Sequence, residues 1–187
     1  MRHYLPRKKE YHEPKKNHLL LLFHGQSIIP ILHIDNPQSA VSLAQALVKG
    51  GLRTIEITLQ TPKALDAIKA ITREVPESIV GAGTILNSLH YKQVERAGAK
   101  FIISPGLSNE LIDCAKDSEI PLLPGALIPS ELTMALEKGY SYLKFFPAEA
   151  ARGIAFVQAL ASPFSEIHFC PTGGITQHNA VQWAPAV

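Results

Sequence analysis

The chain has 187 residues, of which 46% are hydrophobic and 18% are charged, with a formal net charge of +2. This length and composition fit one domain with a single core and argue against general disorder. Residues 1–18 hold six basic and two acidic residues, which leaves 12 basic and 14 acidic residues in the rest. The body of the chain therefore has no basic footprint for nucleic acid. We predict a poorly ordered basic arm at 1–24, followed by a barrel domain at 25–187.

The apolar run at 19–23 follows the basic arm. It is too short for the hydrophobic region of a signal peptide, which has ~7–15 residues, and no other stretch approaches a membrane span. Cys114 and Cys170 match no metal spacing, which predicts free thiols in a reducing compartment. We therefore expect a cytoplasmic protein with neither a membrane nor a nucleic-acid partner.

Strand and helix patterns alternate along the chain from residue 27 onward. Apolar or alternating runs predict strands at 27–32, 54–58, 79–82, 101–104, 121–123, 142–145 and 166–170. Helical periodicity and start signals such as Asn36-Pro37 and Ser108 predict helices at 38–49, 62–72, 89–97, 109–116, 130–138 and 153–160, with another beginning at Gln177. Helix-ending glycines recur at Gly51, Gly98 and Gly139, a spacing of about two βα units.

Repeated βα units form either an open doubly wound sheet or a (β/α)8 barrel. Seven strands are predicted, whereas a full barrel has eight and usually at least ~200 residues. The fold that we expect is α/β: a TIM (β/α)8-type barrel truncated after the seventh strand. The edges of such an unclosed barrel would be exposed, which predicts poor solubility or association unless another segment fills the gap.

Lys144 lies in the strand pattern Tyr142-Leu143-Lys144-Phe145. Alternation places Tyr142 and Lys144 on one face of the strand and Leu143 and Phe145 on the other, so in a barrel Lys144 points into the interior near the carboxyl-end mouth. Desolvation disfavours the charged form of an amine, so a larger fraction of it is neutral and nucleophilic near pH 7, as Schiff-base chemistry requires. The alternative is a lysine whose ammonium reaches solvent from the strand end.

Glu56 lies in the pattern Thr54-Ile55-Glu56-Ile57-Thr58, in which alternation sends the glutamate inward and the isoleucines outward. A buried carboxylate facing the same interior as Lys144 can carry protons, since burial raises its pKa toward the working range. The alternative is a structural ion pair between Glu56 and a basic residue of the barrel. The presence of both residues favours the catalytic interpretation.

Three loops after predicted strands could contact an anion. Gly83-Thr84 and Pro105-Gly106 are turns in which close backbone approach is also explained by ordinary turn geometry. The loop Thr172-Gly173-Gly174 follows the seventh strand, where barrels often bind phosphate through backbone N–H groups. It suggests a phosphorylated or otherwise anionic substrate, with an ordinary βα turn as the alternative. His168 and His178 flank this loop but lack further ligands at metal spacing, so we expect no metal site.

Taken together, five segments closely resemble the 2-keto-3-deoxy-6-phosphogluconate (KDPG) and 4-hydroxy-2-oxoglutarate (KHG) aldolase family. They are Glu56-Ile57-Thr58-Leu59, Gly81-Ala82-Gly83-Thr84, Ile103-Ser104-Pro105-Gly106, the stretch from Leu143 to Glu149, and Cys170-Pro171-Thr172-Gly173-Gly174-Ile175. The resemblance covers about residues 25–179. It implies a class I, cofactor-free and metal-independent lyase on a (β/α)8 barrel, usually a homotrimer. Members cleave 2-dehydro-3-deoxy-6-phosphogluconate to pyruvate and glyceraldehyde 3-phosphate, and some cleave 4-hydroxy-2-oxoglutarate to pyruvate and glyoxylate.

The resemblance also implies roles for individual residues. Lys144 would be the Schiff-base lysine and Glu56 the general acid and base. The substrate-binding residues would be Thr84 at the pyruvate carboxylate, Pro105 and Phe146 lining the pocket, Gln60, and Thr172, Gly173 and Gly174 at the distal, phosphorylated part.

Two departures from the family pattern affect these expectations. Gln60 stands where the family commonly has arginine, so it lacks the charge and bidentate fork, and we predict weaker substrate binding. A neutral amide is also found there in the related 2-dehydro-3-deoxy-6-phosphogalactonate aldolases, which are one alternative. The family's eighth strand and last helix do not follow within the 187 residues, which leaves a non-catalytic, truncated relative as another alternative. A barrel that only binds sugar phosphates is the third.

Overall fold

The computed structural model of the chain describes residues 16–183, in which parallel strands alternate with helices as predicted. The strands are β1 (Ile31–Leu32), β2 (Thr54–Thr58), β3 (Ile79–Gly83), β4 (Ile102–Ile103), β5 (Leu122–Leu123), β6 (Gly125–Ala126), β7 (Tyr142–Phe145) and β8 (His168–Pro171). The helices are α1 (Lys16–Phe23), α2 (Pro37–Lys49), α3 (Ala64–Glu74), α4 (Ser88–Arg96), α5 (Asn109–Asp117), α6 (Pro129–Glu137), α7 (Ile154–Ala161) and α8 (Ala180–Trp183).

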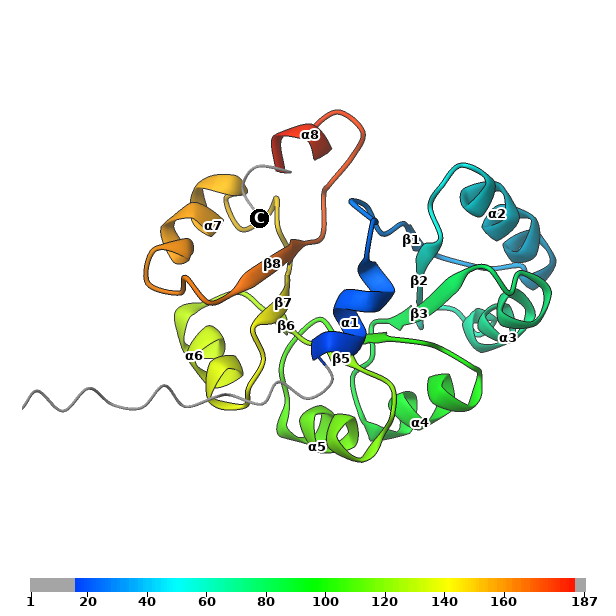
Figure 1. Cartoon of the computed structure of the whole chain (residues 1–187), viewed down its shortest axis with the longest axis horizontal. Helices are drawn as coiled ribbons and strands as arrows, with labels where there is room; N and C mark the ends of the chain where they lie inside the picture. Colours follow the sequence, from blue (N-terminus) through cyan, green and yellow to red (C-terminus); the bar gives the residue numbers. More distant parts are fainter. Residues whose placement is uncertain (1–15, 184–187) are drawn as a thin grey trace, which may run out of the picture.

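All paired strands are parallel, in the orders β1-β2-β3-β4-β5 and β6-β7-β8. Pro124 separates β5, which pairs with β4, from β6, which pairs with β7. Because proline has no N–H group to donate, it interrupts the strand ladder, and β5 and β6 act as one barrel strand. Counted this way, the described residues form the seven predicted strands, which lie in an arc inside the ring of helices α2–α7 (Figure 1).

The barrel is open on one side within the described residues. No pairing joins β1 to β8, which are the two ends of the strand order. Figure 1 shows these two strands on opposite sides of the gap in the arc. The prediction of a truncated (β/α)8-type barrel is therefore confirmed for the part of the chain that the structure describes.

Side-chain alternation in the strands creates two apolar clusters. Outward-facing residues such as Ile55, Ile57, Leu143 and Phe145 are fully buried between the strands and the helices. A smaller cluster of inward-facing residues fills one end of the barrel and contains Phe101, Ile103 and Leu123. Inward and outward positions thus have the period of two that the sequence predicts.

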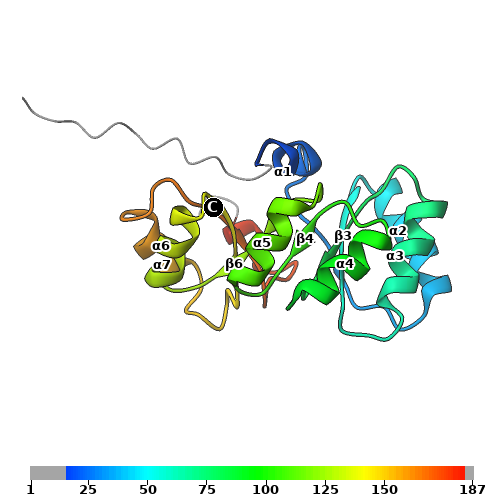
Figure 2. The same ribbon diagram turned by 90° about the horizontal axis from the view of Figure 1, so that it is seen from below.

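Helix α1 covers the amino-terminal end of the strands. Its Leu19 is only 2% exposed and packs in the inward-facing cluster, and Phe23 meets the ring of Phe101 edge-on with centroids 5.1 Å apart. The hydroxyl of Thr54, the first residue of β2, donates a hydrogen bond to the carbonyl of Leu22. Figure 2 shows α1 beyond one end of the barrel.

The poorly ordered arm that the sequence predicts at 1–24 lies only partly within the described residues. Residues 1–15 lie outside the described part of the chain, whereas residues 16–23 form α1 rather than a poorly ordered tail. The physical reason is the apolar run at 19–23, which is buried against inward-facing side chains of distant strands.

Side-chain caps explain the starts of three helices. The side chains of Asn36, Asn87 and Ser108 each accept a hydrogen bond from a backbone N–H in the first turn of α2, α4 and α5, respectively.

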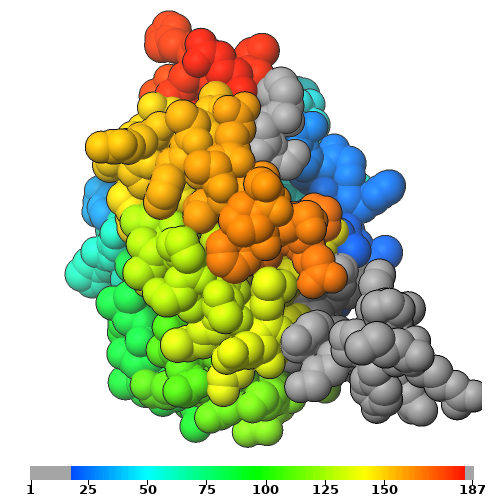
Figure 3. All heavy atoms as spheres, turned by 90° about the vertical axis from the view of Figure 1, so that its left-hand side faces the viewer, coloured from blue at the N-terminus to red at the C-terminus, as the bar shows by residue number. Residues whose placement is uncertain are grey.

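Figure 3 shows the side of the molecule where α6 and α7 cover the strands, with the red segment containing α8 at the upper edge. Within residues 16–183, no helix is long and apolar enough to span a bilayer.

Candidate active site

Lys144 and Glu56 meet inside the barrel. The Nζ of Lys144 on β7 lies 3.4 Å from Oε1 of Glu56 on β2, and both residues are buried, with exposed fractions of 6% and 2%. Both side chains therefore point inward, as strand alternation predicts. The ammonium of Lys144 also lies 5.4 Å from the centroid of the Phe146 ring, within reach of a cation–π contact.

Burial raises the pKa of the Glu56 carboxyl above its usual 4.5, and the neighbouring Lys144 only partly opposes this shift. Desolvation disfavours the carboxylate, so Glu56 holds a proton more readily than an exposed glutamate. A proton passed from the Lys144 ammonium to Glu56 leaves a neutral amine next to a carboxylic acid. The pair can therefore supply both a nucleophile and a proton donor.

Gly83, at the end of β3, permits the position of the Glu56 side chain. A Cβ added to Gly83 would overlap the Glu56 carboxyl group. The next residue, Thr84, is half-buried and has a φ of 60°, a left-handed conformation that is uncommon for a β-branched residue. Strain of this kind is retained where the surrounding structure holds it, and Thr84 directly follows the glycine that contacts Glu56.

Pro105 belongs to the turn after β4 and is half-buried. Its carbonyl lies against Gly125, where an added Cβ would overlap it, and Gly125 pairs in register with Lys144. Pro105 is thus one strand away from the lysine, at the same end of the barrel.

The segment after β7 and the loop after β8 are joined by backbone hydrogen bonds. Ala148 N–H donates to the Thr172 carbonyl at 2.8 Å, and Glu149 N–H donates to the Gly173 carbonyl at 3.1 Å. The Phe146 ring lies against Gly173, where a Cβ would approach it to 3.3 Å. These contacts bring Phe146, Thr172 and Gly173 together at the carboxyl end of the strands.

Gly173 and Gly174 both have positive φ values, 97° and 81°. Their carbonyls accept hydrogen bonds, from Glu149 N–H and from the Asn179 side chain respectively. Within residues 16–183, no hydrogen bond to a protein acceptor is made by either glycine N–H. This loop therefore has donors available to an anion, as a phosphate site requires.

The remaining predicted residues lie outside this arrangement, except Cys170, which pairs in register with Lys144. Gln60 is exposed, two residues beyond β2. His168 and His178 are exposed, and His168 stacks on Tyr142 at the amino end of β8. Cys114 and Cys170 are free thiols, and burial raises the pKa of Cys170 to about 11. No group of three potential metal ligands occurs in the described residues.

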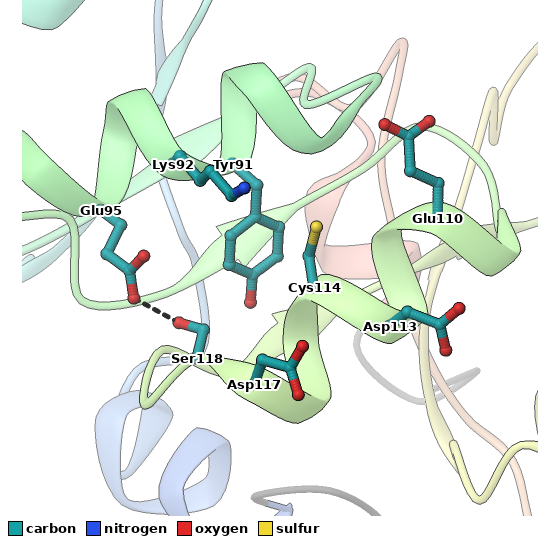
Figure 4. A pocket seen from close by; sticks show the side chains of 8 residues that line it. All are labelled: Tyr91, Lys92, Glu95, Glu110, Asp113, Cys114, Asp117 and Ser118. Carbon is teal, nitrogen blue, oxygen red and sulfur yellow. Dashed lines mark hydrogen bonds between the residues drawn. The ribbon is translucent and has the colours of Figure 1, made fainter.

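A separate pocket of about 410 Å³ lies between α4 and α5 on the outside of the barrel (Figure 4). Its lining includes the acidic residues Glu95, Glu110, Asp113 and Asp117 and one basic residue, Lys92. None of the predicted site residues contributes to it. An acidic lining repels an anionic substrate, so this pocket is not the substrate site of a phosphate-binding protein.

Several residues that shape the site were not predicted to do so. Gly83 was expected only as part of a turn that could contact an anion, and Gly125 was given no role, yet each makes room for a group from a neighbouring part of the barrel. Glu149 and Trp183 form a side-chain hydrogen bond of 2.7 Å across 34 residues. Only a knowledge of which strands are neighbours could have revealed these contacts.

Comparison with known proteins places this arrangement in a family. The family model described as KDPG and KHG aldolase matches residues 22–186. The KHG/KDPG aldolase of Escherichia coli K12 is 49% identical over 152 residues, which cover 81% of this chain and 71% of the relative.

Two solved structures are similar in both fold and sequence. The KDPG aldolase of Legionella pneumophila, with pyruvate captured as a covalent carbinolamine intermediate, has a TM-score of 0.83 and 41% identity, covering 87% of this chain and 79% of its own. The Zymomonas mobilis ZM4 enzyme with 3-phosphoglycerate has a TM-score of 0.85 and 39% identity, covering 91% and 80%.

The fold and these relatives define a (β/α)-barrel protein of the aldolase class. The chain belongs to the KDPG and KHG aldolase family.

Proposed function

We propose that this protein is a class I aldolase that cleaves 2-dehydro-3-deoxy-6-phosphogluconate to pyruvate and glyceraldehyde 3-phosphate. The observation that carries the proposal is the buried Lys144–Glu56 pair, with 3.4 Å between Nζ and Oε1, in a chain of this family. A structural ion pair alone is a weaker explanation, because replacing such a pair with apolar residues is often neutral or stabilising.

The reaction begins when the neutral Lys144 amine attacks the C2 ketone of the substrate. The resulting carbinolamine takes a proton from the Glu56 carboxylic acid, loses water and becomes an iminium ion, which accepts the electron pair of the C3–C4 bond. Glu56, as a carboxylate, removes the proton of the C4 hydroxyl, so that C4 leaves as the aldehyde. The same carboxyl then returns a proton to C3 of the enamine, and water releases pyruvate and the free lysine.

The neighbouring residues suit the two ends of this substrate. Thr84 and Pro105 lie after β3 and β4, close to the Glu56 and Lys144 positions, and would contact the pyruvyl part. Thr172, Gly173 and Gly174 would bind the distal part, with the glycine N–H groups at the phosphate. Gln60, exposed beyond β2, would contribute a neutral hydrogen bond where arginine would contribute a charge.

Cleavage of 4-hydroxy-2-oxoglutarate to pyruvate and glyoxylate is the second activity that we propose, because the E. coli relative carries both substrate names. The phosphogalactonate alternative has less support, since the relatives reported above are named for KDPG. The homotrimer and the cytoplasmic location stay predictions.

A retro-aldol assay tests the proposal directly. Pyruvate release from 2-dehydro-3-deoxy-6-phosphogluconate is followed with lactate dehydrogenase and NADH, using the whole chain. Turnover that disappears in Lys144→Ala supports the aldolase. Folded protein without turnover favours the truncated, non-catalytic relative, and turnover that persists in Lys144→Ala contradicts the Schiff-base mechanism.

A further inference from the structure

Glu149, in the segment after β7, contacts both the glycine loop after β8 and helix α8. Its backbone N–H donates to the Gly173 carbonyl at 3.1 Å. Its side chain passes so close to Gly174 that a Cβ added there would approach the Glu149 Cβ to 2.6 Å. Its carboxylate Oε1 accepts a hydrogen bond of 2.7 Å from the indole N–H of Trp183.

Trp183, the last residue of α8, provides a fixed anchor for this carboxylate. Its side chain is buried, with 4% exposure, and belongs to the large apolar cluster between strands and helices. Its ring also approaches Gly153, at the start of α7, where an added Cβ would lie 4.0 Å from it. The indole N–H is therefore held by packing, and a charge-assisted hydrogen bond to it fixes the rotamer of Glu149.

The position of the Glu149 carboxylate also matters electrostatically. A free carboxylate beside Gly173 and Gly174 would repel a bound phosphate. The hydrogen bond to Trp183 fixes the carboxylate on the Trp183 side and leaves the two glycine N–H groups without a protein acceptor in the described residues. Donors that are already fixed bind an anion without a further cost in loop ordering.

We propose that Glu149, anchored by Trp183, is a positioning residue for the Gly173–Gly174 loop and sets the affinity for the phosphate end of the substrate. It does not act on the reacting carbon atoms, which lie at Lys144. This inference rests on the proposed aldolase function. It predicts that losing the Glu149–Trp183 hydrogen bond weakens binding of the phosphorylated substrate while leaving pyruvate chemistry at Lys144 intact.

The experiment compares the wild-type chain with Glu149→Ala, Trp183→Phe, the double variant and Glu149→Gln. Glu166→Ala is the matched control, because Glu166 is exposed and precedes β8 at the opposite end of the strand. Two quantities are measured: KM and kcat for 2-dehydro-3-deoxy-6-phosphogluconate, and the pyruvate concentration that gives half-maximal borohydride-trapped adduct. Pyruvate has no phosphate and therefore reports on the lysine end alone.

We expect Glu149→Ala and Trp183→Phe each to raise KM by about 10- to 150-fold, as for the loss of one hydrogen bond to a charged group, with kcat changed less than about twofold. The double variant should match Glu149→Ala, because both lack the hydrogen bond and the carboxylate that Trp183→Phe would set free. Glu149→Gln keeps the acceptor oxygen and should restore the wild-type KM. Half-maximal pyruvate trapping should be unchanged in all variants, and Glu166→Ala should resemble the wild type.

Other results would overturn the inference. An equal rise in KM for the phosphorylated substrate and in the pyruvate concentration for half-maximal trapping would indicate a general structural role for Glu149. Additive effects in the double variant, or an unchanged KM in both single variants, would show that the hydrogen bond does not position the loop. A wild-type chain that neither turns over the substrate nor traps pyruvate would contradict the proposed function itself, which is a separate result from any of these.

Discussion

The Nζ of Lys144 lies 3.4 Å from Oε1 of Glu56, although 88 residues separate the two in the sequence. The contact spans the barrel from β7 to β2, and neither residue is more than 6% exposed. In such surroundings each charge is costly without the other, so the two groups are energetically coupled. This coupling is the basis of the chemistry that we propose.

The pH dependence should show the raised pKa of Glu56. The base form of Glu56 is lost as pH falls through this pKa, so the acid limb of kcat/KM should have an apparent pKa above 4.5. Glu56→Gln should lower kcat by about 10²- to 10⁴-fold and remove that limb. Steady-state rates between pH 4 and 9 provide the test. An acid limb at or below pH 4.5, or one that survives in Glu56→Gln, would exclude Glu56 as the base.

Gly83→Ala should displace the Glu56 carboxyl, because the new Cβ would overlap it. A displacement of about 1 Å in a catalytic group can lower kcat by about 10²-fold, and we expect a loss of that order with the fold retained by circular dichroism. Gly106→Ala is the control, since no atom lies within 4 Å of a Cβ built there. If both variants keep full activity, the Glu56 position seen here is not the catalytic one.

Gln60→Arg should strengthen substrate binding. Gln60 is exposed beyond β2, and an arginine there could form a charge-assisted hydrogen bond to an anionic group of the substrate. We expect KM to fall by about 10-fold, with the gain reduced at high salt. Gln158→Arg, at an exposed position on α7, controls for the added charge. An equal effect from both substitutions would mean that only the net charge matters.

Leu19→Ala should destabilise the fold by about 2–4 kcal/mol, because it removes a buried side chain from the inward-facing cluster. Leu21→Ala is the matched control on the same helix, since Leu21 is 74% exposed, and should change stability by less than about 0.5 kcal/mol. Urea unfolding measures both. Equal stabilities for the two variants would show that α1 does not contribute to the barrel core.

Local patterns were sufficient to predict the seven barrel strands, the helices α2–α7 and the directions of Lys144 and Glu56. Alternation within β2 and β7 needs no knowledge of the partner strands, and the Ser108 cap needs only the next few residues. The helix at 16–23 was not predicted, because its stability depends on Phe101 and Leu123, which are distant in the sequence. The tight contact of Gly83 with Glu56 depends on the pairing of β2 with β3, and so was also beyond local patterns.

The most direct measurement is borohydride trapping with pyruvate, followed by intact-protein and peptide mass spectrometry. We predict a reduced pyruvyl adduct on the peptide containing Lys144, and no adduct in Lys144→Met, which keeps the length of the side chain without the amine. Lys116→Met is the control, because Lys116 is an exposed lysine paired with Asp113 on α5. An adduct that persists in Lys144→Met, or no adduct on folded wild-type protein, would contradict the assignment of Lys144 as the Schiff-base lysine.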